Sequence, residues 1–398
     1  MESFPLEDIL PKDSGRARLV GRVWDPESGG PRIVAVRGED VYDITDAART
    51  VADLIEQADP VRIVEEALDR PRWTLAELVE ASWNKDTGRP HLLAPVDLQV
   101  IKACGVTFVE SMVERVIEER CAGDANKAAE VRELVGKALG GSLSSLRPGS
   151  DAAMQAKKVL IAEGMWSQYL EVGIGPDPEV FTKAPVLSAV GFGTDVGLPA
   201  FSSWNNPEPE LVLVVDSCGS VRGATLGNDV NLRDVEGRSA LLLGKAKDNN
   251  ASTALGPFIR LFDGDFTLDT LRREEITLEV RGQDGYFLEG RNNIAKISRP
   301  FEELVGAARG RHHQYPDGFV LFTGTLFAPT QDRDTPGQGF THKPGDTVAI
   351  RSEHLGALVN RTGVTEELPP WTFGIRDLFA YLQSPAAAGT PQQAGRNA

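Results

Sequence analysis

The segment that most constrains this chain is residues 204–234, WNNPEPELVLVVDSCGSVRGATLGNDVNLRD. The run ELVLVV is apolar at successive positions, as in a strand buried on both faces, and the turn-forming residues DSCG would fold a second strand back against it. Glu208 and Glu210 are two residues apart at the start of the first strand, so both side chains point to one face. A pairing closed by this turn places Asp229 opposite Asn206, beside Glu208. The segment therefore predicts a buried hairpin with three carboxylates at one end.

Three like charges within a few ångströms repel one another unless protons or a cation neutralise them. A site of oxygen ligands alone favours Mg²⁺, with Mn²⁺ or Ca²⁺ as alternatives, over zinc. We therefore expect Glu208, Glu210 and Asp229 to bind a divalent cation. The alternative is that the glutamates are solvated at the start of a strand and that Asp229 caps a turn. The apolar residues on both faces of the strand argue against this alternative, because buried carboxylates without a partner are costly.

Composition narrows the class of protein. The chain has 398 residues, with 42 lysines and arginines against 58 aspartates and glutamates, and a formal net charge of −16. Such a charge repels nucleic acid and the anionic face of a membrane, so neither is expected as a partner. No apolar run is long enough to cross a bilayer, the N-terminus lacks the pattern of a signal peptide, and three scattered cysteines match neither a zinc site nor a disulfide framework. We expect a globular cytoplasmic protein.

The order of patterns along the chain predicts a mixed α+β fold that is mainly β. Residues 1–98 combine short β-type runs with two helical stretches, VADLIEQA and TLAELVEAS, and are expected to form a small N-terminal α/β cap domain. Residues 99–383 begin with helical patterns at 108–120 and 126–139. They then become rich in short strands bounded by Gly, Asp and Pro, as in a rolled sheet or barrel. The last segment, 384–398, lacks apolar periodicity and is expected to be a disordered tail.

Several motifs stand in the order found in a known superfamily. Beyond the E-x-E pair and GNDVNLRD, the chain contains GVTFVESMVE, EVFTKAP, AKDNNASTALGP, ISRP, FTGTLFAP, KPGD and LGALVN. In these motifs it resembles the fumarylacetoacetate hydrolase superfamily from about Leu98 to its end. Over its whole length the chain is similar to one branch of this superfamily, the 2-keto-3-deoxy-pentonate dehydratases. The segments that carry this similarity are WSQYLEV, SWNNPEPE, HHQYPDG and QDRDTPGQGFTHKPGD. The resemblance implies a catalytic domain with a rolled β-sheet and a lid helix, and a homodimer or homotetramer.

One departure from the superfamily pattern bears on the reaction. Hydrolytic members carry a His–Glu dyad on the first lid helix, which activates water. Here Ser111 stands at the histidine position and Glu114 keeps the glutamate, while all five histidines lie elsewhere in the sequence. Hydrolysis of a C–C bond is therefore less expected than dehydration, which needs no attacking water. Glu236 stands where the superfamily has a glutamine near the metal-binding aspartate, and no role is assigned to it.

The resemblance implies a small 2-keto-3-deoxy sugar acid as substrate, with its carboxylate and keto oxygen on the metal. The metal polarises the keto group and acidifies carbon 3, so that loss of the carbon-3 proton and the carbon-4 hydroxyl, followed by a proton shift from carbon 5, gives 2,5-dioxopentanoate. Lys247 aligns with the superfamily lysine that faces the ligand, and is predicted to be the base, with a pKa lowered by partial burial near the cation. Glu114 is predicted to help the hydroxyl leave.

Each predicted role has a structural alternative. Lys247 could be a solvated loop residue, with Lys245 pointing inward instead. Glu114 could pair with Arg115 on an exposed helix face. Arg233 could have no more than a structural role, in which it neutralises Asp229 and Asp234.

The remaining expectations concern substrate contacts and the competing functions. The residues predicted to contact the substrate are Phe108, Ser111, Arg233, Asn250 and Thr325. The leading function is a metal-dependent dehydratase of a 2-keto-3-deoxy-pentonate. The alternative is a hydrolase of acylpyruvates or diketo sugar acids, and a third possibility is a metal-stabilised protein without catalysis. Release of pyruvate would distinguish the hydrolase from the dehydratase.

Overall fold

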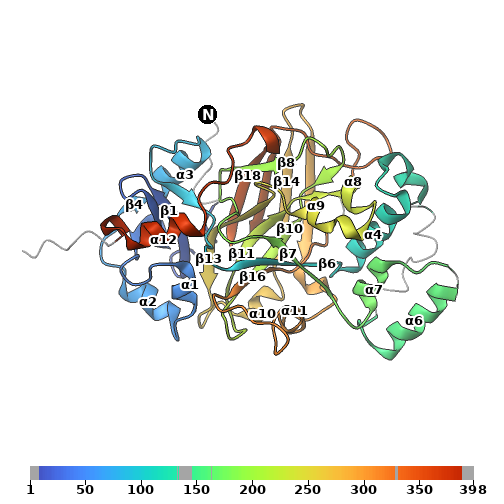
Figure 1. Cartoon of the computed structure of the whole chain (residues 1–398), viewed down its shortest axis with the longest axis horizontal. Helices are drawn as coiled ribbons and strands as arrows, with labels where there is room; N and C mark the ends of the chain where they lie inside the picture. The colour runs from blue at the N-terminus through green and yellow to red at the C-terminus, as the bar shows by residue number, and fades with distance from the viewer. Residues whose placement is uncertain (1–8, 132, 134–145, 163, 328–329, 388–398) are drawn as a thin grey trace, which may run out of the picture.

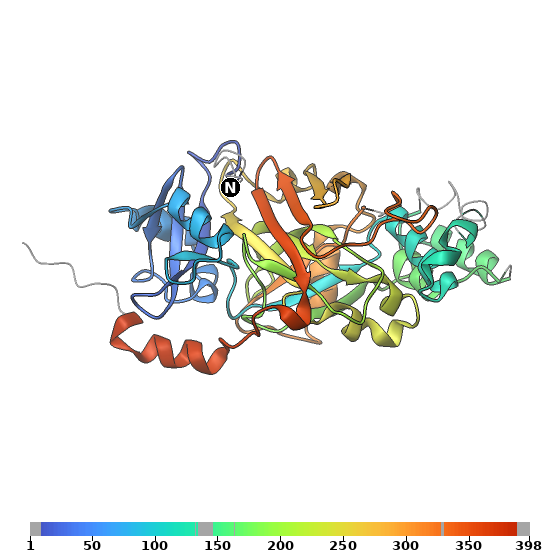
Figure 2. The same ribbon diagram turned by 90° about the horizontal axis from the view of Figure 1, so that it is seen from above.

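The computed structural model describes residues 9–131, 133, 146–162, 164–327 and 330–387. The molecule is elongated, with an N-terminal group of strands and helices at one end, large sheets in the middle and a group of helices at the other end (Figures 1 and 2). In the part of the chain that is described, no helix is long and apolar enough to span a membrane. The mainly β, mixed α and β architecture predicted from the sequence is confirmed.

One large sheet runs through both the N-terminal and the central region. Within the described residues it has eleven strands in the order β4-β3-β2-β1-β13-β11-β10-β16-β6-β7, with β5 also paired to β1. The N-terminal strands join the rest where Leu19 of β1 pairs with Arg260 of β13. The boundary expected near residue 98 is therefore no break in the sheet, and the division into two domains stays a prediction. The strands are β1 (Leu19–Asp25), β2 (Gly30–Arg37), β3 (Asp40–Asp43), β4 (Trp73–Thr74), β5 (His91–Leu93), β6 (Val100–Gly105), β7 (Glu179–Ala184), β10 (Pro209–Val215), β11 (Val221–Asp229), β13 (Thr253–Leu261) and β16 (Phe319–Phe322).

A second sheet packs against the large one. Among the described residues its strand order is β15-β14-β17-β18-β8. Strands β9 and β12 form a separate two-stranded sheet. Leu211 and Leu213 of β10 share one hydrophobic core with Leu278 of β14 and Ile350 of β17. This core fixes the hairpin that carries the predicted carboxylates. The strands are β8 (Asp195–Leu198), β9 (Asn205–Asn206), β12 (Asn231–Leu232), β14 (Glu275–Arg281), β15 (Phe287–Asn293), β17 (Thr347–Ser352) and β18 (Gly356–Val364).

Helices cover the sheets and close the two ends of the molecule. The α-helices are α1 (Val51–Ile55), α2 (Pro60–Glu66), α3 (Leu75–Trp83), α4 (Val109–Cys121), α6 (Asp151–Ala162), α7 (Gln168–Ile174), α8 (Arg233–Glu236), α9 (Leu243–Lys247), α10 (Leu268–Leu271), α11 (Phe301–Ala308) and α12 (Ile375–Gln383). Short 3-10 helices are η2 (Ala125–Lys127), η3 (Ala240–Leu242), η4 (Ile294–Lys296), η5 (Thr365–Glu367) and η6 (Pro385–Ala387). Of the helix predicted over 126–139, residues 128–131 are helical, and most of the rest lies outside the described residues.

The central hairpin forms as its sequence predicts. All seven residues of β10 are buried, because β11 and β16 flank it and apolar side chains cover both faces. The turn to β11 places Gly219 at a φ of +89°, in the left-handed region that favours glycine. At Gly227 of β11 an added Cβ would lie 2.3 Å from the ring of Phe322, so the close packing of β11 with its neighbours needs a glycine there.

The pairing register of this hairpin corrects the prediction. The turn is closed by Asp216 and Ser220, and a bulge between Val214 and Val215 shifts the pairing further. As a result the backbone N–H of Asp229 donates to the carbonyl of Glu208 at 3.0 Å, whereas Asn206 pairs with Asn231. The prediction that Asp229 lies opposite Asn206 is therefore wrong. The turn is longer than the prediction assumed, and the correct register brings Asp229 closer to Glu208.

Helix α4 is amphipathic, with one face packed on α7 and the other face carrying polar residues next to the carboxylates. Its apolar residues, among them Met112 and Ile117, pack against Leu170 and Ile174 of α7. Its other face carries Ser111, Glu114, Arg115 and Glu118, all buried or nearly so. This helix is the lid helix that the superfamily resemblance implies.

The C-terminal segment packs back on the N-terminal strands, as Figure 2 shows for α12. An added Cβ at Gly30 of β2 would lie 2.4 Å from the ring of Tyr381 on α12, so helix and strand are in close contact. The chain stays ordered as far as Ala387, whose carbonyl accepts a hydrogen bond from Arg32. Residues 384–387, the start of the segment predicted to be disordered, thus pack on the N-terminal region, and residues 388–398 lie outside the described residues.

Candidate metal centre and active site

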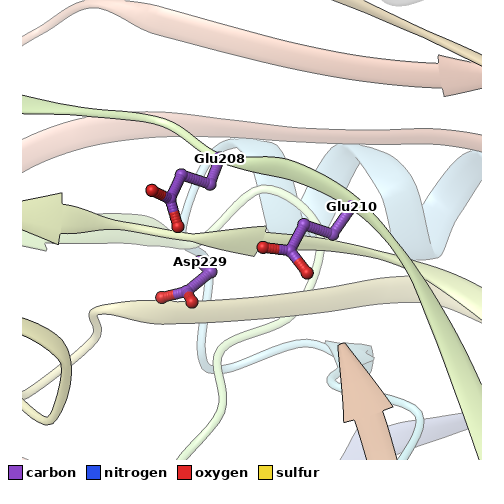
Figure 3. A group of neighbouring side chains, drawn as sticks. All are labelled: Glu208, Glu210 and Asp229. Atoms are coloured by element: carbon purple, nitrogen blue, oxygen red, sulfur yellow. The ribbon is translucent and has the colours of Figure 1, made fainter. Parts of the chain in front are cut away.

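Three buried carboxylates meet at one end of the β10–β11 hairpin (Figure 3). Glu208 directly precedes β10, Glu210 is in β10, and Asp229 ends β11. Each of these residues is at most 3% exposed, and one oxygen from each lies within 4.8 Å of the others. The structure thus brings together the three residues that the sequence predicts as metal ligands.

Two lysines and a backbone amide hold these carboxylates in place. Lys247, the last residue of α9, donates from Nζ to Glu208 Oε2 at 2.6 Å and to Asp229 Oδ2 at 3.1 Å. Lys183 of β7 lies 2.9 Å from the other oxygen of Asp229. The backbone N–H of Gly324 donates to Glu210 Oε2 at 2.6 Å. Each carboxylate therefore has a donor, as buried anions require.

The pKa values of Glu210 and Asp229 are shifted in opposite directions. Burial and the charges of Asp229 and Glu208 raise the pKa of Glu210 well above its usual range. Burial also acts to raise the pKa of Asp229, but Lys183 and Lys247 outweigh it and lower that pKa. Glu210 is therefore the member of the triad whose negative charge is least compensated by protein groups. A cation bound among the three would compensate it.

The donor set fits a divalent cation that prefers oxygen ligands. Three carboxylates with oxygens within 4.8 Å of one another, and with the pKa of Glu210 raised by its like-charged neighbours, are what a Mg²⁺, Mn²⁺ or Ca²⁺ ion would stabilise. No sulfur or imidazole is among the residues of this triad, which disfavours zinc.

A second layer of charges links the lid helix to the triad. Arg115 of α4 donates from Nη2 to Glu208 Oε1, and its Nη1 lies 2.6 Å from Glu118 and 2.9 Å from Glu236. Arg233 in turn donates to Glu118 at 2.6 Å, and Glu114 lies 3.4 Å from its Nη2. The lid helix is thus tied by ion pairs both to a predicted metal ligand and to α8.

A small cavity of about 20 Å³ opens beside the triad. Its size leaves room for little more than one water molecule, because Arg115 and Lys247 reach across to Glu208. The lining residues are Cys104, Gly105, Val106, Ser111, Arg115, Glu179, Phe181, Glu208, Glu210, Asp229, Glu236, Lys247, Gly324 and Thr325.

Strand β7 supplies three of the groups at the site from one of its faces. These groups are Glu179, Phe181 and Lys183, which are two residues apart along the strand, so their side chains point to the same face. Burial and the charge of Glu236 raise the pKa of Glu179 to about 7, against the opposing effect of Arg115. A carboxyl group with this pKa can accept or donate a proton near neutrality.

The remaining predicted residues are divided between the cavity and its surroundings. Ser111 and Thr325 line the cavity. Phe108 is buried in the large hydrophobic core, and Asn250 hydrogen-bonds the carbonyl of Pro369; neither lines the cavity. Arg233 is fully buried in ion pairs and against Trp204, in agreement with the structural alternative for it, although its partners are glutamates.

Lys247 occupies the predicted position, but its environment differs from the expected one. It is buried and contacts two of the triad carboxylates, whereas Lys245 lies over the ring of Phe201. Burial alone would lower the pKa of Lys247, but Asp229, Glu208 and Glu236 outweigh burial and raise it above its usual range. The predicted lowering of this pKa depends on a cation bound beside the amine, so it stays a prediction.

Glu114 lies away from the cavity, and three residues close to the triad were not predicted as site residues. Glu114 is buried beside Arg233 and is absent from the cavity lining, so the structure places it behind the site. Glu179, Lys183 and Arg115 were missed. The signal for the first two was a glutamate and a lysine with the same parity in the strand-like EVFTKAP. Arg115 had only its place next to Glu114 in the lid helix as a signal.

Comparison with known proteins supports the superfamily assignment. The fumarylacetoacetate hydrolase C-terminal family matches residues 168–362. The 2-dehydro-3-deoxy-D-arabinonate dehydratase of Saccharolobus solfataricus is 34% identical over 185 residues, which are 46% of this chain and 57% of that protein. The match thus spans little more than half of that relative. The probable 2-keto-3-deoxyxylonate dehydratase of Haloferax volcanii is 28% identical over 336 residues, covering 84% of this chain and 96% of that protein.

Solved structures share the fold. A 2-keto-3-deoxy-D-arabinonate dehydratase in its apo form, and the same enzyme complexed with magnesium and 2,5-dioxopentanoate, each superimpose with a TM-score of 0.60 at 21% identity, covering 87% of this chain and 99% of the other. The E-x-E pair, the aspartate that follows on the next strand and the family match lie in the same part of the chain. Residues 168–362, which carry the triad and Lys247, thus match the fumarylacetoacetate hydrolase C-terminal family.

Proposed function

We propose that this protein is a divalent-cation-dependent hydro-lyase that converts a 2-keto-3-deoxy-pentonate, such as 2-keto-3-deoxy-D-xylonate or D-arabinonate, to 2,5-dioxopentanoate. The observation that carries the proposal is the buried triad of Glu208, Glu210 and Asp229, with Lys247 in contact with two of its members. Two relatives named as dehydratases of 2-keto-3-deoxy-pentonates support the substrate class. The expected place of such a reaction is the degradation of pentoses without phosphorylation.

The groups around Ser111 favour dehydration over C–C hydrolysis. Hydrolysis of an acylpyruvate or diketo acid needs a group that activates water, and Ser111 lines the cavity where hydrolytic relatives are expected to carry a histidine. All five histidines of the chain fall within the described residues, and none lines the cavity. His342 pairs with Asp346, and His354 pairs with Glu274.

The reaction requires several proton transfers in sequence. A proton leaves carbon 3 and the hydroxyl leaves carbon 4 with a proton, which gives water and a double bond between carbons 3 and 4. A proton is then lost from carbon 5 and one is gained at carbon 3. The resulting enol becomes the aldehyde when carbon 4 gains a proton and the carbon-5 hydroxyl loses its own. The bound divalent cation supplies the Lewis acid that makes the carbon-3 proton acidic.

We assign these proton transfers to two side chains of the cavity. We assign Lys247 to the carbon-3 proton, as the sequence analysis does, because it is the amine that reaches the triad. We assign Glu179 to the departing hydroxyl, in place of Glu114, because Glu179 lines the cavity and its pKa is raised to about 7. Thr325 and Ser111 are left to hydrogen-bond the substrate.

Product identity tests the proposal. The protein is incubated with Mg²⁺ and a panel of 2-keto-3-deoxy-pentonates, 2-keto-3-deoxy-hexonates and an acylpyruvate, and both aldehyde and pyruvate are measured. We expect 2,5-dioxopentanoate from a pentonate and no pyruvate. Release of pyruvate would show C–C cleavage and would support the hydrolase alternative instead.

A further inference from the structure

Both oxygens of Glu208 already have a positively charged partner. Lys247 donates to Oε2 at 2.6 Å, and Arg115 donates from Nη2 to Oε1. Glu208 is only 3% exposed, and Arg115 reaches it from the lid helix, a different element from the one that carries Lys247. A divalent cation bound to Glu208 would have to share or take an oxygen that Arg115 now uses.

The other end of the same guanidinium is anchored. Arg115 Nη1 lies 2.6 Å from Glu118 and 2.9 Å from Glu236, and both of these carboxylates are buried. Glu118 is fixed in turn by Arg233, which is fully buried. Charge-assisted hydrogen bonds to buried groups are the strong ones. If Nη2 is released from Glu208, Nη1 therefore stays where it is, and Nη2 remains at the cavity wall that Arg115 already lines.

We propose that Arg115 is a positioning residue that couples the divalent cation to the substrate anion. Binding of the cation displaces Arg115 Nη2 from Glu208, and the freed N–H groups then donate to an oxygen of the 2-keto acid. This inference rests on the proposed binding of a cation by Glu208. It goes beyond the proposed function because it predicts the order and the energetic coupling of the two ligands.

The balance of charge supports the coupling. Among the described residues, the cationic side chains in ion pairs with the triad are Lys183, Lys247 and Arg115. A divalent cation added to this set repels the nearby ammonium and guanidinium groups. A monoanionic 2-keto acid relieves that repulsion, so that each ligand raises the affinity for the other, as linkage requires.

The experiment compares Mn²⁺ affinity, with and without pyruvate, in the wild-type protein and in Arg115→Met. Pyruvate is the probe because it carries the 2-keto acid group alone. In Arg115→Met we expect Mn²⁺ to bind about tenfold more tightly in the absence of pyruvate, because the competing charged hydrogen bond is gone. Pyruvate should then improve Mn²⁺ binding less than it does in the wild type. A merely structural role for Arg115 predicts weaker binding of both ligands.

Two further variants act as controls. Arg120→Met removes an exposed arginine from the same helix and should leave both affinities unchanged. Arg115→Met combined with Glu236→Gln keeps the net charge and avoids leaving Glu236 unpaired, so it separates direct competition from a general change in charge and protects against failure to fold. This double variant should still bind Mn²⁺ more tightly than Glu236→Gln alone.

The outcomes distinguish this inference from the proposed function. Unchanged or weaker Mn²⁺ binding in the Arg115 variants, or an undiminished effect of pyruvate, would overturn the coupling role. A wild-type protein that shows the coupling with Mn²⁺ and pyruvate but forms no 2,5-dioxopentanoate would overturn the proposed function and leave the role of Arg115 standing.

Discussion

Glu179 is a residue of the cavity whose pKa lies close to neutral pH. Burial and Glu236 raise its pKa to about 7, whereas its ordinary value is 4.5. The pKa of Lys247, by contrast, is raised against the effect of burial by Asp229, Glu208 and Glu236, and a cation bound among the triad carboxylates would oppose this shift. The two side chains therefore differ in their readiness to exchange protons, and each assignment can be tested separately.

Glu179→Gln should remove a pH dependence of stability. The folded protein keeps a proton on Glu179 that the unfolded chain releases, so the wild type loses stability, relative to the variant, as the pH rises from about 4.5 to about 7. Urea unfolding in EDTA across this range measures the difference. Turnover should also fall by about 10²–10⁴-fold, the usual contribution of a positioned acid or base. Parallel stability curves for the two proteins would contradict the raised pKa.

Lys247→Met should separate ligand binding from chemistry. Binding of Mn²⁺ and pyruvate does not need the amine, so neither affinity should fall, whereas turnover should fall by about 10²–10⁴-fold. Deuterium exchange at carbon 3 of the full substrate is the decisive measurement. If the variant exchanged this hydrogen at the wild-type rate, another group would remove the proton, and Glu179 would be the first to test. Lys245→Met, at a position over Phe201, is the matched control and should remain active.

At the scale of elements, the hairpin was predictable and its register was not. Short runs rich in Val, Leu, Phe and Thr predicted β10, β11, β14 and β17, and the E-x-E spacing at the start of β10 predicted that two carboxylates share a face. The bulge next to Val215 and the longer turn have no sequence signal of their own, so Asp229 was placed two residues from its true partner. Strand β13 was not predicted, because Pro257 interrupts its pattern.

The site shows the same division between local and non-local information. The triad and Lys247 lie in one continuous stretch, residues 208–247, where spacing and motif order are informative. Arg115, Glu179 and Lys183 come from α4 and β7, which reach the triad only through the tertiary fold. Glu114 was predicted to help the hydroxyl leave because of its position in the motif, but in the structure it pairs with Arg233 and does not line the cavity.

The loop after β16 provides a test of how an element positions the triad. Gly324 has a φ of +90°, and an added Cβ would lie 2.0 Å from Thr107 Oγ1, while its N–H donates to Glu210. Gly324→Ala should therefore lower the free energy of unfolding by about 1–3 kcal/mol and weaken Mn²⁺ binding.

Gly306→Ala is the matched control for this substitution. Gly306 is in α11, and an added Cβ meets nothing within 4 Å, so alanine should be neutral or stabilise the helix by about 1 kcal/mol or less. Unchanged Mn²⁺ affinity in Gly324→Ala, measured on folded protein, would mean that the loop does not position Glu210.

At the scale of the whole molecule, the N-terminal region and the site-bearing region share one sheet. Leu19 and Val20 of β1 pair with β13, which also flanks β11. From the other side, α12 returns to pack Tyr381 against β2. The sequence indicated a separate cap because its patterns change near residue 98, but strand pairing across that point is a long-range property. The homodimer or homotetramer expected from the resemblance stays a prediction.

This continuity predicts a single unfolding transition. Because β1, β13 and β11 are neighbours in one sheet, the N-terminal strands should not unfold while the site-bearing hairpin stays intact. Differential scanning calorimetry should therefore show one peak, and Mn²⁺ should move the whole peak to higher temperature. Two resolved peaks, of which Mn²⁺ shifts only one, would instead show that residues 1–98 form an independent domain.

The central claim is that Glu208, Glu210 and Asp229 hold the divalent cation on which the dehydration depends. The most direct measurement is the rate of 2,5-dioxopentanoate formation from 2-keto-3-deoxy-D-xylonate or D-arabinonate after exhaustive chelation with EDTA and after Mg²⁺ or Mn²⁺ is added back. We expect activity to disappear and then return in the wild type, and to stay absent in Glu208→Gln, which should remain folded but bind the cation weakly. Full activity after exhaustive chelation would contradict the claim.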